Sequence, residues 1–406
     1  MVDENSASTA SPEAISETVV DIVIIGAGIA GSTAAALLAR QGYDCALISM
    51  HEHFPPDFRA EKIGEPQMQV LDRGGLGAVA RAASVRFEGA WLHRFGYLAE
   101  RGTDIEYACD YADLMNAIRT ALPEAVRFIV GKVREIETSE TDQAVTLADG
   151  RRIVARLVVI ATGLVDAVRR MVGIEREVVS PAHSVSYGFD MTYPEDGLPF
   201  PSLVWSDVTF GERLSYLTLF PYRDRIRANL FAYRSITDEW TEAFKARPDE
   251  TLAATIPGLE ALLGKSRITG PVVARPVDVI DVRNHIRPGV VVVGDAFKTV
   301  CPITGTGVDK ALTDVVQLCD VHIPAWFKTP GMGADKIARY YADPVKVARD
   351  RSARRMTLDS KSIKLDPSPY WTYRRLRSQT LGRARLMLRS ILRSLLPHKD
   401  SASTKA

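Results

Sequence analysis

The chain has 406 residues, of which 46% are hydrophobic and 25% charged, a composition typical of a folded protein with one or two domains and a large apolar core. Its 51 basic and 50 acidic side chains leave a net charge of +1, so the molecule as a whole lacks the basic field of a nucleic-acid-binding protein. The sequence has no secretory signal and no apolar run of transmembrane length, and its four cysteines are widely spaced, so we expect a cytoplasmic protein without disulfides or a metal site.

The first ordered segment is expected to be a βαβ unit that begins at Val19. The run "VVDIVII" predicts a buried strand, "STAAALLARQG" predicts a helix that ends near Gly42, and "DCALIS" predicts a second strand. Gly26, Gly28 and Gly31 form a G-x-G-x-x-G pattern at the turn between strand and helix. Such glycines allow a tight turn, close approach of a pyrophosphate and close helix packing, so the unit predicts a dinucleotide site.

The end of the second strand lacks the acidic residue that ordinarily bonds the ribose of a dinucleotide. Ser49 stands at that position, and Glu52 could replace it only if the strand end is rearranged. The next segment, "FRAEKIGEPQMQVLDRGGLG", predicts a loop that leads into a short amphipathic helix. By its place in such a loop, Arg59 could be an ordinary surface arginine.

The pattern then changes to one that predicts a second sheet. "EGAWLHRFGYLAERGTDIEYACDY" alternates and is rich in aromatic residues, and four segments between Ser184 and Ile280 predict an antiparallel sheet with helices around "DEWTEAFKAR" and "TLAATIPGLEALLG". Between these regions, "ADLMNAIRTAL" predicts a helix and "RLVVIATG" a buried strand. "GVVVVGDAF" returns to the first sheet, and a second glycine loop, "CPITGTG", opens another helix.

We therefore predict an α/β fold in which a Rossmann-like nucleotide-binding domain is interrupted by an antiparallel β-sheet substrate domain and followed by C-terminal helices. The predicted divisions are a disordered N-terminus at 1–18, the nucleotide-binding domain at 19–85, 109–172 and 281–325, the substrate domain at 86–108 and 173–280, a C-terminal helical region at 326–397, and a disordered tail at 398–406.

The last part of the chain predicts a basic amphipathic helix. Arginines stand at 374, 375, 377, 383, 385, 389 and 393 of "PSPYWTYRRLRSQTLGRARLMLRSILRSLLP", with no acidic residue among them. On a helical wheel, one face carries Leu381, Ala384, Leu388, Ile391, Leu392 and Leu395, flanked by Arg385, Arg389 and Arg393. Such a helix can pack on the core, dock a protein partner or lie on an anionic membrane surface, so the protein is expected either free in the cytoplasm or peripheral at a membrane.

Three ordered motifs between Val19 and Val321 carry a family resemblance. They are "GAGIAG", "ATGLVDAVR" in the place of A-D-G-x-x-S-x-V-R, and "GDAFKTVCPITGTGVDKALTDV" in the place of G-D-A-x-H-x-x-x-P-x-x-G-x-G-x-N. The chain resembles the FAD-dependent monooxygenases of the p-hydroxybenzoate hydroxylase type, whose relatives include flavin-dependent halogenases and geranylgeranyl reductases. "KIGEP" is similar to the K-x-G-E segment of the halogenases, but their W-x-W-x-I-P signature is missing.

This resemblance implies FAD as the cofactor and NAD(P)H as the electron donor. The implied FAD-binding residues are Gly26, Ala27, Gly28, Ala30, Gly31, Ser49, Arg59, Thr162, Gly163, Asp295, Pro302, Gly305, Thr306 and Gly307. Among them, Asp295 matches the aspartate that holds the ribityl chain of the flavin, and Pro302, Gly305 and Gly307 match the loop that faces the flavin ring. A helix N-terminus at this loop would stabilise negative charge on the reduced ring.

The implied reaction is hydroxylation of an electron-rich aromatic or polycyclic small molecule by molecular oxygen through a flavin C4a-hydroperoxide. The implied catalytic residues are Arg227, Tyr222 and Asn229, and further candidate substrate contacts are His183, Tyr187, Trp205 and Arg225. Each of these side chains has an alternative role as a satisfied structural group. Cys301, beside the second glycine loop, is expected to be a plain buried thiol.

Four positions differ from the family pattern. Thr162 replaces an aspartate connected with use of the nicotinamide cofactor, Tyr111 replaces an arginine or glutamine, Lys298 replaces a histidine, and Asp309 replaces an asparagine. Direct reduction by NADPH is therefore expected to be slow. Two other functions remain open: a flavin-dependent reductase or dehydrogenase of a lipid or isoprenoid, and a flavoprotein that acts on a protein partner held by the basic helix.

Overall fold

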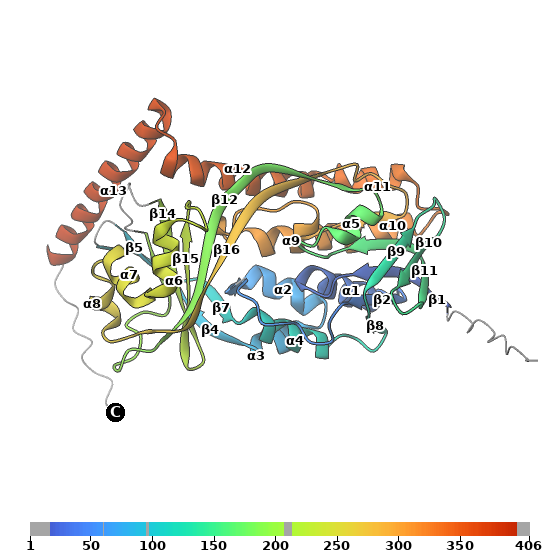
Figure 1. Ribbon diagram of the computed structural model, residues 1–406, viewed down its shortest axis with the longest axis horizontal. Helices are drawn as coiled ribbons and strands as arrows, with labels where there is room; N and C mark the ends of the chain where they lie inside the picture. Colours follow the sequence, from blue (N-terminus) through green and yellow to red (C-terminus); the bar gives the residue numbers. More distant parts are fainter. Residues whose placement is uncertain (1–16, 60, 95–96, 207–212, 396–406) are drawn as a thin grey trace, which may run out of the picture.

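The computed structural model describes residues 17–59, 61–94, 97–206 and 213–395 (Figure 1). The expected disordered ends lie outside these residues, except for Glu17 and Thr18. Those two residues pair with Arg152 and Ile153, so the first strand begins at Glu17, two residues before Val19.

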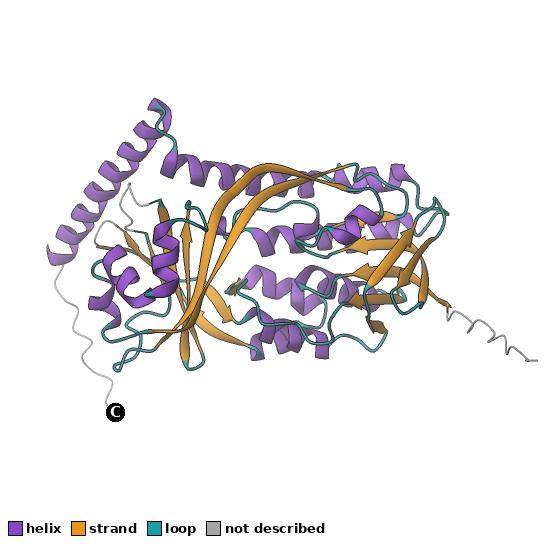
Figure 2. Ribbon diagram, in the orientation of Figure 1, coloured by secondary structure: helices purple, strands orange, loops and turns teal. Residues whose placement is uncertain are grey.

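The first sheet is mainly parallel and forms one end of the elongated molecule (Figures 1 and 2). Its strand order is β8-β2-β1-β11-β10-β9, with β17 also paired to β11. The strands are β1 Glu17–Ile25, β2 Cys45–Ser49, β8 Val126–Val130, β9 Val133–Glu137, β10 Gln143–Leu147, β11 Arg152–Ile160 and β17 Val290–Val292. The C-terminal halves of the central strands β1 and β11 are apolar and buried because helices or loops cover both faces, and α1, Ile29–Arg40, follows β1 as expected for a βαβ unit.

The second sheet is largely antiparallel, with the order β16-β12-β15-β14-β13-β5-β6. Its strands are β5 Trp91–Arg94, β6 Tyr97–Arg101, β12 Glu175–Thr192, β13 Leu203–Trp205, β14 Leu214–Tyr222, β15 Arg225–Ala232 and β16 Ile268–Arg283. Three helices pack on one face of it: α6 Glu239–Ala246, α7 Pro248–Thr255 and α8 Leu259–Leu263. Alternation along β12 directs Val185, Tyr187 and Phe189 into this core, which leaves the polar Ser186 on the other face.

A small third sheet and the remaining helices complete the fold. The sheet has the order β3-β7-β4, formed by Lys62–Gly64, Ile105–Cys109 and Ser84–Glu88. The other helices are α2 Glu65–Arg73, α3 Gly77–Ala82, α4 Tyr111–Thr120, α5 Ala167–Met171, α9 Gly307–Val316, α10 Ile323–Trp326, α11 Ala334–Tyr341, α12 Pro344–Leu365 and α13 Pro369–Leu395.

Long elements connect the two large sheets. Strands β12 and β16 pair along most of their length and curve from the antiparallel sheet toward the parallel one, while α12 runs above both parts (Figure 1). This arrangement confirms the predicted fold class: a Rossmann-like sheet, a second antiparallel sheet inserted into the chain, and C-terminal helices.

A buried group of four charges joins α9 to α12. The ammonium group of Lys346 lies 2.7 Å from a carboxylate oxygen of Asp314 and 3.2 Å from one of Asp350, while Lys310 lies 3.1 Å from Asp314 and 3.4 Å from Asp350. Asp314 also accepts a hydrogen bond of 2.9 Å from the backbone N–H of Gly294. The four charges sum to zero, so the attraction between opposite charges compensates for the loss of their hydration on burial.

The pKa shifts of these groups follow from burial and pairing. Burial acts to raise the pKa of Asp314, but Lys310 and Lys346 outweigh it and hold that pKa below its ordinary value. Burial likewise acts to lower the pKa of Lys310, but Asp314 and Asp350 raise it overall, whereas the pKa of Lys346 is lowered because burial dominates there. The cluster therefore depends on all four side chains.

Replacing Lys346 by Met should destabilise the fold strongly. The change leaves two buried carboxylates with a single lysine, and breaking such a buried pair costs about 3–5 kcal/mol of unfolding free energy. Urea unfolding followed by circular dichroism measures this loss. Lys245→Met, which removes an exposed pair with Glu242, is the control and should change stability by about 1 kcal/mol or less. Equal, small losses in both variants would contradict the role of the cluster.

Candidate cofactor and substrate site

The first glycine loop follows β1 and has two glycines packed tightly and one that faces open space. Gly26 has φ +107°, and a Cβ there would lie 2.5 Å from the carbonyl oxygen of Ala161. A Cβ on Gly31 would lie 1.9 Å from the carbonyl oxygen of Gly26. A Cβ on Gly28 would meet only the hydroxyl of Tyr111, at 3.6 Å. The backbone at Gly28 can therefore be approached closely, as binding of a pyrophosphate at the α1 N-terminus requires.

The second glycine loop follows β17 and has the same open character. Gly305 has φ +64°, a conformation that favours glycine, and a Cβ there would meet no described atom within 4 Å. A Cβ on Gly307 would meet only Val300, at 3.9 Å. The backbone of this loop is therefore accessible to a ligand, directly before the N-terminus of α9.

Asp295 precedes this loop and has an unused carboxylate. The residue is half-buried, and among the described residues its side chain takes part in no hydrogen bond or ion pair. Burial raises the pKa of Asp295, while the nearby charges of Lys310 and Arg59 act in the opposite direction. A desolvated acceptor without a donor from the protein fits a ligand that carries hydroxyl groups, such as the ribityl chain of FAD.

Arg59 lies against Gly163 from a separate segment, and its charge acts on the Asp295 carboxyl. A Cβ on Gly163 would lie 3.7 Å from a guanidinium nitrogen of Arg59, which itself pairs with Asp57 at 2.6 Å. The charge of Arg59 also acts on the pKa values of Asp295 and Tyr111. The structure thus brings Arg59, Gly163 and Asp295 together between the two glycine loops.

The hydroxyl groups of two other predicted cofactor residues donate hydrogen bonds to backbone carbonyls close by in the sequence. The hydroxyl of Ser49 donates to the carbonyl of His51 at 2.8 Å, and that of Thr162 donates to the carbonyl of Val165 at 3.1 Å. Arg119 of α4, which sequence reasoning missed, donates to the carbonyl of Ala27 in the first glycine loop at 2.9 Å. These contacts shape the two ends of the predicted cofactor site.

Arg169 explains the arginine of "ATGLVDAVR". Its guanidinium is buried, pairs with Asp166, and donates to the carbonyl oxygen of Ala296 at 2.6 Å. It therefore holds the turn that carries Asp295. Sequence reasoning did not assign this residue, although the motif itself was the available signal.

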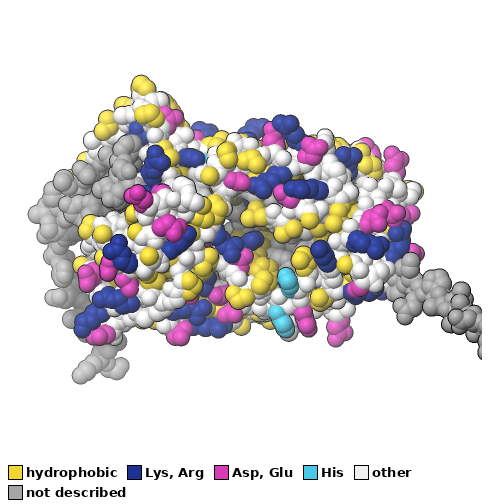
Figure 3. Space-filling model, viewed as in Figure 1, with side chains coloured by type: hydrophobic (Ala, Val, Ile, Leu, Met, Phe, Trp, Pro, Cys, Tyr) yellow, Lys and Arg dark blue, Asp and Glu magenta, His cyan; other side chains and the backbone are white. Residues whose placement is uncertain are grey.

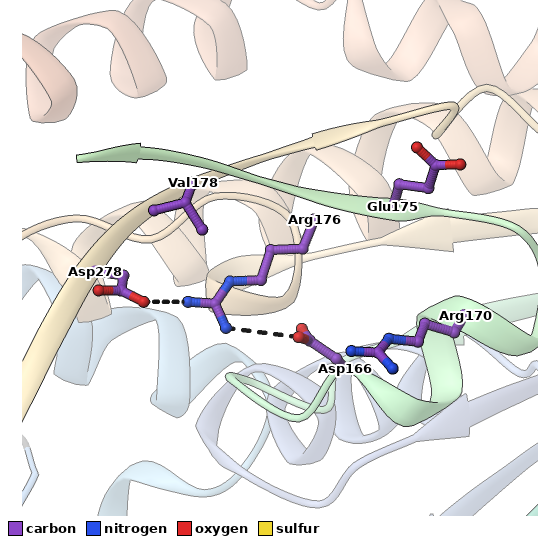
Figure 4. A pocket seen from close by; sticks show the side chains of 6 residues that line it. All are labelled: Asp166, Arg170, Glu175, Arg176, Val178 and Asp278. Carbon is purple, nitrogen blue, oxygen red and sulfur yellow. Dashed lines mark hydrogen bonds and ion pairs between the residues drawn. The ribbon is translucent and has the colours of Figure 1, made fainter. Parts of the chain in front are cut away.

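An open cavity of about 550 Å³ lies beside Asp166 of the "ATGLVDAVR" motif (Figure 4). Its lining residues are Asp166, Arg170, Glu175, Arg176, Val178 and Asp278. Arg176 crosses it and pairs with Asp278 at 2.5 Å and with Asp166 at 3.5 Å. None of the predicted cofactor or substrate residues lines this cavity, and Arg176 spans it through its two ion pairs, so it does not support the predicted site.

The polar face of the antiparallel sheet meets the cofactor loops at Glu61. The amide of Asn229 donates to the Glu61 carboxylate at 2.6 Å and accepts from the hydroxyl of Ser186 at 2.7 Å. On the neighbouring strand, the Tyr216 hydroxyl donates to the carbonyl oxygen of Ile303, in the second glycine loop, at 2.6 Å. Figure 3 shows a hollow between the two parts of the molecule at the centre of the face drawn.

Glu61 is the main residue that sequence reasoning missed. Burial raises the pKa of its carboxyl, opposed by hydrogen bonds from its own backbone and from Asn229 and by the charge of Arg227. Burial raises the pKa of Tyr216, and the charges of Cys301 and Glu61 act in the same direction. The place of Glu61 two residues after Arg59, in the same loop, was the available signal.

The three predicted catalytic residues have different surroundings. Asn229 lies in the Glu61 cluster, as described above. Arg227 is 2% exposed, pairs with Asp110 at 2.5 Å and lies over the ring of Phe58 at 3.9 Å. Tyr222 donates to Asp113 of α4 at 2.7 Å, at the far end of the β14–β15 hairpin. Arg227 and Tyr222 thus position this hairpin against α4, and Asn229 faces the loops.

The other candidate contacts on this sheet do not converge on the loops. Tyr187 shares a hydrogen bond of 2.6 Å with Thr241 in the core under α6, and Trp205 stacks on His93 at 3.9 Å. Arg225 pairs with Asp190 at 3.1 Å.

Two further side chains are buried close to Ser184 and Ser180. Burial lowers the pKa of His183 to about 4, and its ring contacts Ser180 at 3.1 Å. Cys301 is buried 3.1 Å from the hydroxyl of Ser184, and burial raises the pKa of its thiol, which disfavours a reactive thiolate.

Residues 19–321 match the model of a family described as "FAD binding domain". An uncharacterized protein of Mycobacterium tuberculosis is 31% identical over 175 residues, which are 39% of this chain and 46% of that protein, so the chain spans about half the length of the first curated relatives it matches. The 3-demethoxyubiquinol 3-hydroxylase of Escherichia coli is 25% identical over 331 residues, 75% of this chain and 80% of that protein.

Among solved structures, the p-nitrophenol 4-monooxygenase of Pseudomonas putida superposes with a TM-score of 0.72 at 16% identity, covering 93% of this chain and 98% of that one. At this identity the likeness shows the fold alone. Within the described part of the chain, no helix is long and apolar enough to cross a membrane, and no three or more His, Cys, Asp or Glu side chains are grouped as metal ligands.

Replacing Asp295 by Asn should weaken FAD binding. A charge-assisted hydrogen bond contributes about 1.5–3 kcal/mol, which corresponds to about tenfold to a hundredfold in Kd. Fluorescence titration of the flavin-free protein with FAD measures the change. Asp335→Asn, at an exposed position on α11, should leave the Kd unaltered. An unchanged Kd in the Asp295 variant would show that this carboxylate does not hold the cofactor.

Proposed function

The chain belongs to the FAD binding domain family, and from this premise we propose that it is an FAD-dependent monooxygenase that hydroxylates an electron-rich aromatic substrate. Reduced FAD supplies oxygen activation when it is bound, and the protein supplies binding, orientation and proton transfer. The residues fit FAD: Gly28 and the α1 N-terminus for the pyrophosphate, Asp295 for the ribityl hydroxyls, and the open loop at Gly305–Gly307 for the ring.

The proposal rests on the surroundings of the Glu61 carboxylate. It lies on the loop that also carries Arg59 and is bonded to Asn229 of the antiparallel sheet, and on the neighbouring strand the hydroxyl of Tyr216 contacts the second glycine loop. A carboxylate with a raised pKa is a better acceptor for a weakly acidic proton, because its proton affinity lies closer to that of the donor.

We infer that Glu61 accepts the proton of a phenol or aryl amine. Loss of that proton increases the electron density of the ring, which then reacts more readily with electrophilic oxygen. Asn229 holds the carboxylate in place, and the rings of Tyr216 and Phe231, which pack together at 4.9 Å, provide an apolar wall for an aromatic substrate. The names of two relatives support this class, because 3-demethoxyubiquinol and p-nitrophenol are both phenols.

NAD(P)H is the proposed electron donor and molecular oxygen the second substrate. Two electrons from NAD(P)H and one oxygen molecule yield one hydroxyl group on the ring and one water. Thr162 uses its hydroxyl in a local turn and carries no charge, which supports slow reduction in the absence of substrate.

The oxygen requirement of NAD(P)H consumption tests the proposed function. The FAD-loaded protein is mixed with a panel of phenols, aryl amines, isoprenoids and peptides, in air and under nitrogen. Hydroxylation predicts oxygen-dependent turnover with one phenol or aryl amine and a product that carries one atom from ¹⁸O₂. Turnover of an isoprenoid under nitrogen would instead establish a reductase, and modification of a peptide would establish a flavoprotein that acts on proteins.

Replacing Glu61 by Gln should lower kcat for that substrate by about a hundredfold, the order of effect of a positioned general base. The acid limb of the wild-type pH–rate profile should lie above the ordinary pKa of 4.5 and should vanish in the variant. Steady-state kinetics between acid and neutral pH measure both quantities. Glu88→Gln, at an exposed position on β4, serves as the control.

Thermal unfolding distinguishes loss of a base from loss of the fold. Because the folded pKa of Glu61 is raised, its protonated form contributes stability that is complete below the ordinary pKa and is lost as pH rises through the raised one. The Gln variant should therefore have a higher Tm than the wild type at pH 8 and a similar Tm near pH 4. A lower Tm at both pH values would mean that Glu61 is structural.

A further inference from the structure

Helix α13 extends from the end of α12 at one edge of the molecule (Figure 1). Its 27 residues correspond to a length of about 40 Å. Only its first half has described polar contacts with the rest of the chain: Arg375 donates to the carbonyl of Asp366 at 2.6 Å, and Arg94 of β5 donates to the hydroxyl of Ser378 at 3.3 Å. The helix is thus fixed at its base and projects beyond it.

One face of α13 carries four exposed apolar or aromatic side chains, and Arg377 lies on that same face between Tyr373 and Leu381. Tyr370, Tyr373, Leu381 and Leu388 are 61%, 63%, 47% and 59% exposed, and their spacings of three, eight and seven residues place them on a single side of a helix. None of these four contributes to a hydrophobic cluster among the described residues. Figure 3 shows hydrophobic side chains gathered at the corner where α12 meets α13. Core packing, one of the alternatives from the sequence, therefore does not explain this face.

The charge of α13 has one sign only. The helix contains seven arginines and no acidic residue, so it carries +7, whereas the rest of the chain carries −6. An anionic surface would attract the helix and repel the remainder of the molecule. The charge distribution therefore orients the protein with α13 toward such a surface.

We propose that α13 lies in the interface of an anionic lipid membrane. Its leucines would enter the acyl boundary, its arginines would contact lipid phosphates, and the aromatic residues at its start would lie among the headgroups, where tyrosine and tryptophan are favoured. A nucleic acid would neutralise the arginines but leave the apolar face in water. A protein partner would cover the helix only if it offered an apolar groove bordered by acidic groups along its exposed length.

Vesicle flotation of the full-length, FAD-loaded protein tests this proposal. The vesicles contain phosphatidylcholine with about 30% phosphatidylglycerol, or phosphatidylcholine alone, and flotation is measured at low and at high salt because screening weakens surface attraction. We expect the protein to float with the anionic vesicles at low salt, with at least a tenfold lower bound fraction on the neutral ones. No flotation with anionic vesicles would overturn the proposal.

Paired variants separate the two contributions of the helix. Leu381→Asp with Leu388→Asp removes the apolar face, and Arg374→Glu with Arg377→Glu reverses two of its charges. Each pair should reduce flotation by about tenfold. The matched controls are Val321→Asp with Val345→Asp and Arg247→Glu with Arg339→Glu, at exposed positions on other elements, and both should float as the wild type does.

Other occupants of this face would give different results. Binding of duplex DNA that is unaffected by the two leucine changes, without flotation, would identify a nucleic-acid surface and overturn the proposal. A dimer that the leucine changes dissociate, and that does not float, would identify a second copy of this chain as the occupant and overturn it as well. FAD content measured for every variant verifies that the catalytic part is intact.

Discussion

The buried contact between Asp314 and the Gly294 backbone holds the turn after β17 that carries Asp295 and precedes the second glycine loop. Asp314 can remain charged there only because Lys310 and Lys346 lie against it, and Lys346 reaches it from a helix that comes later in the chain. On the other side of the same turn, Arg169 holds the carbonyl of Ala296. Asp295 lies between these two contacts. Its position is therefore determined by segments that come many residues before it and after it in the chain.

Two carboxyl groups beside the cofactor loops, those of Asp295 and Glu61, lie where burial disfavours their charged form. Asp295 has no partner among the described residues, and burial raises the pKa of both Asp295 and Glu61. Elsewhere in the described interior, charged groups such as Lys346 and Arg169 are paired. Carboxyl groups whose pKa is perturbed by burial are common at functional sites, because a ligand or substrate can complete their hydrogen bonds.

The antiparallel sheet separates structural from functional side chains by its alternation. On β12, Tyr187 lies in the core beneath α6, while the adjacent Ser186 bonds to Asn229 on the face toward the cofactor loops. At the far end of the sheet, Tyr222 and Arg227 hold the hairpin against α4. One sheet thus supplies a packed layer on one side and a polar wall on the other.

The sequence by itself determined the βαβ unit, both glycine loops, the inserted antiparallel sheet and the family resemblance, because periodicity and glycine spacing act within a few residues of each other. It did not determine the role of Glu61, whose partner Asn229 is 168 residues away, or the role of Arg169, which contacts a carbonyl 127 residues away. Its wheel for α13 identified an apolar face but not that Leu381 and Leu388 on that face are exposed. Only the tertiary structure decided these points, because burial, pairing and desolvation depend on which distant segments meet.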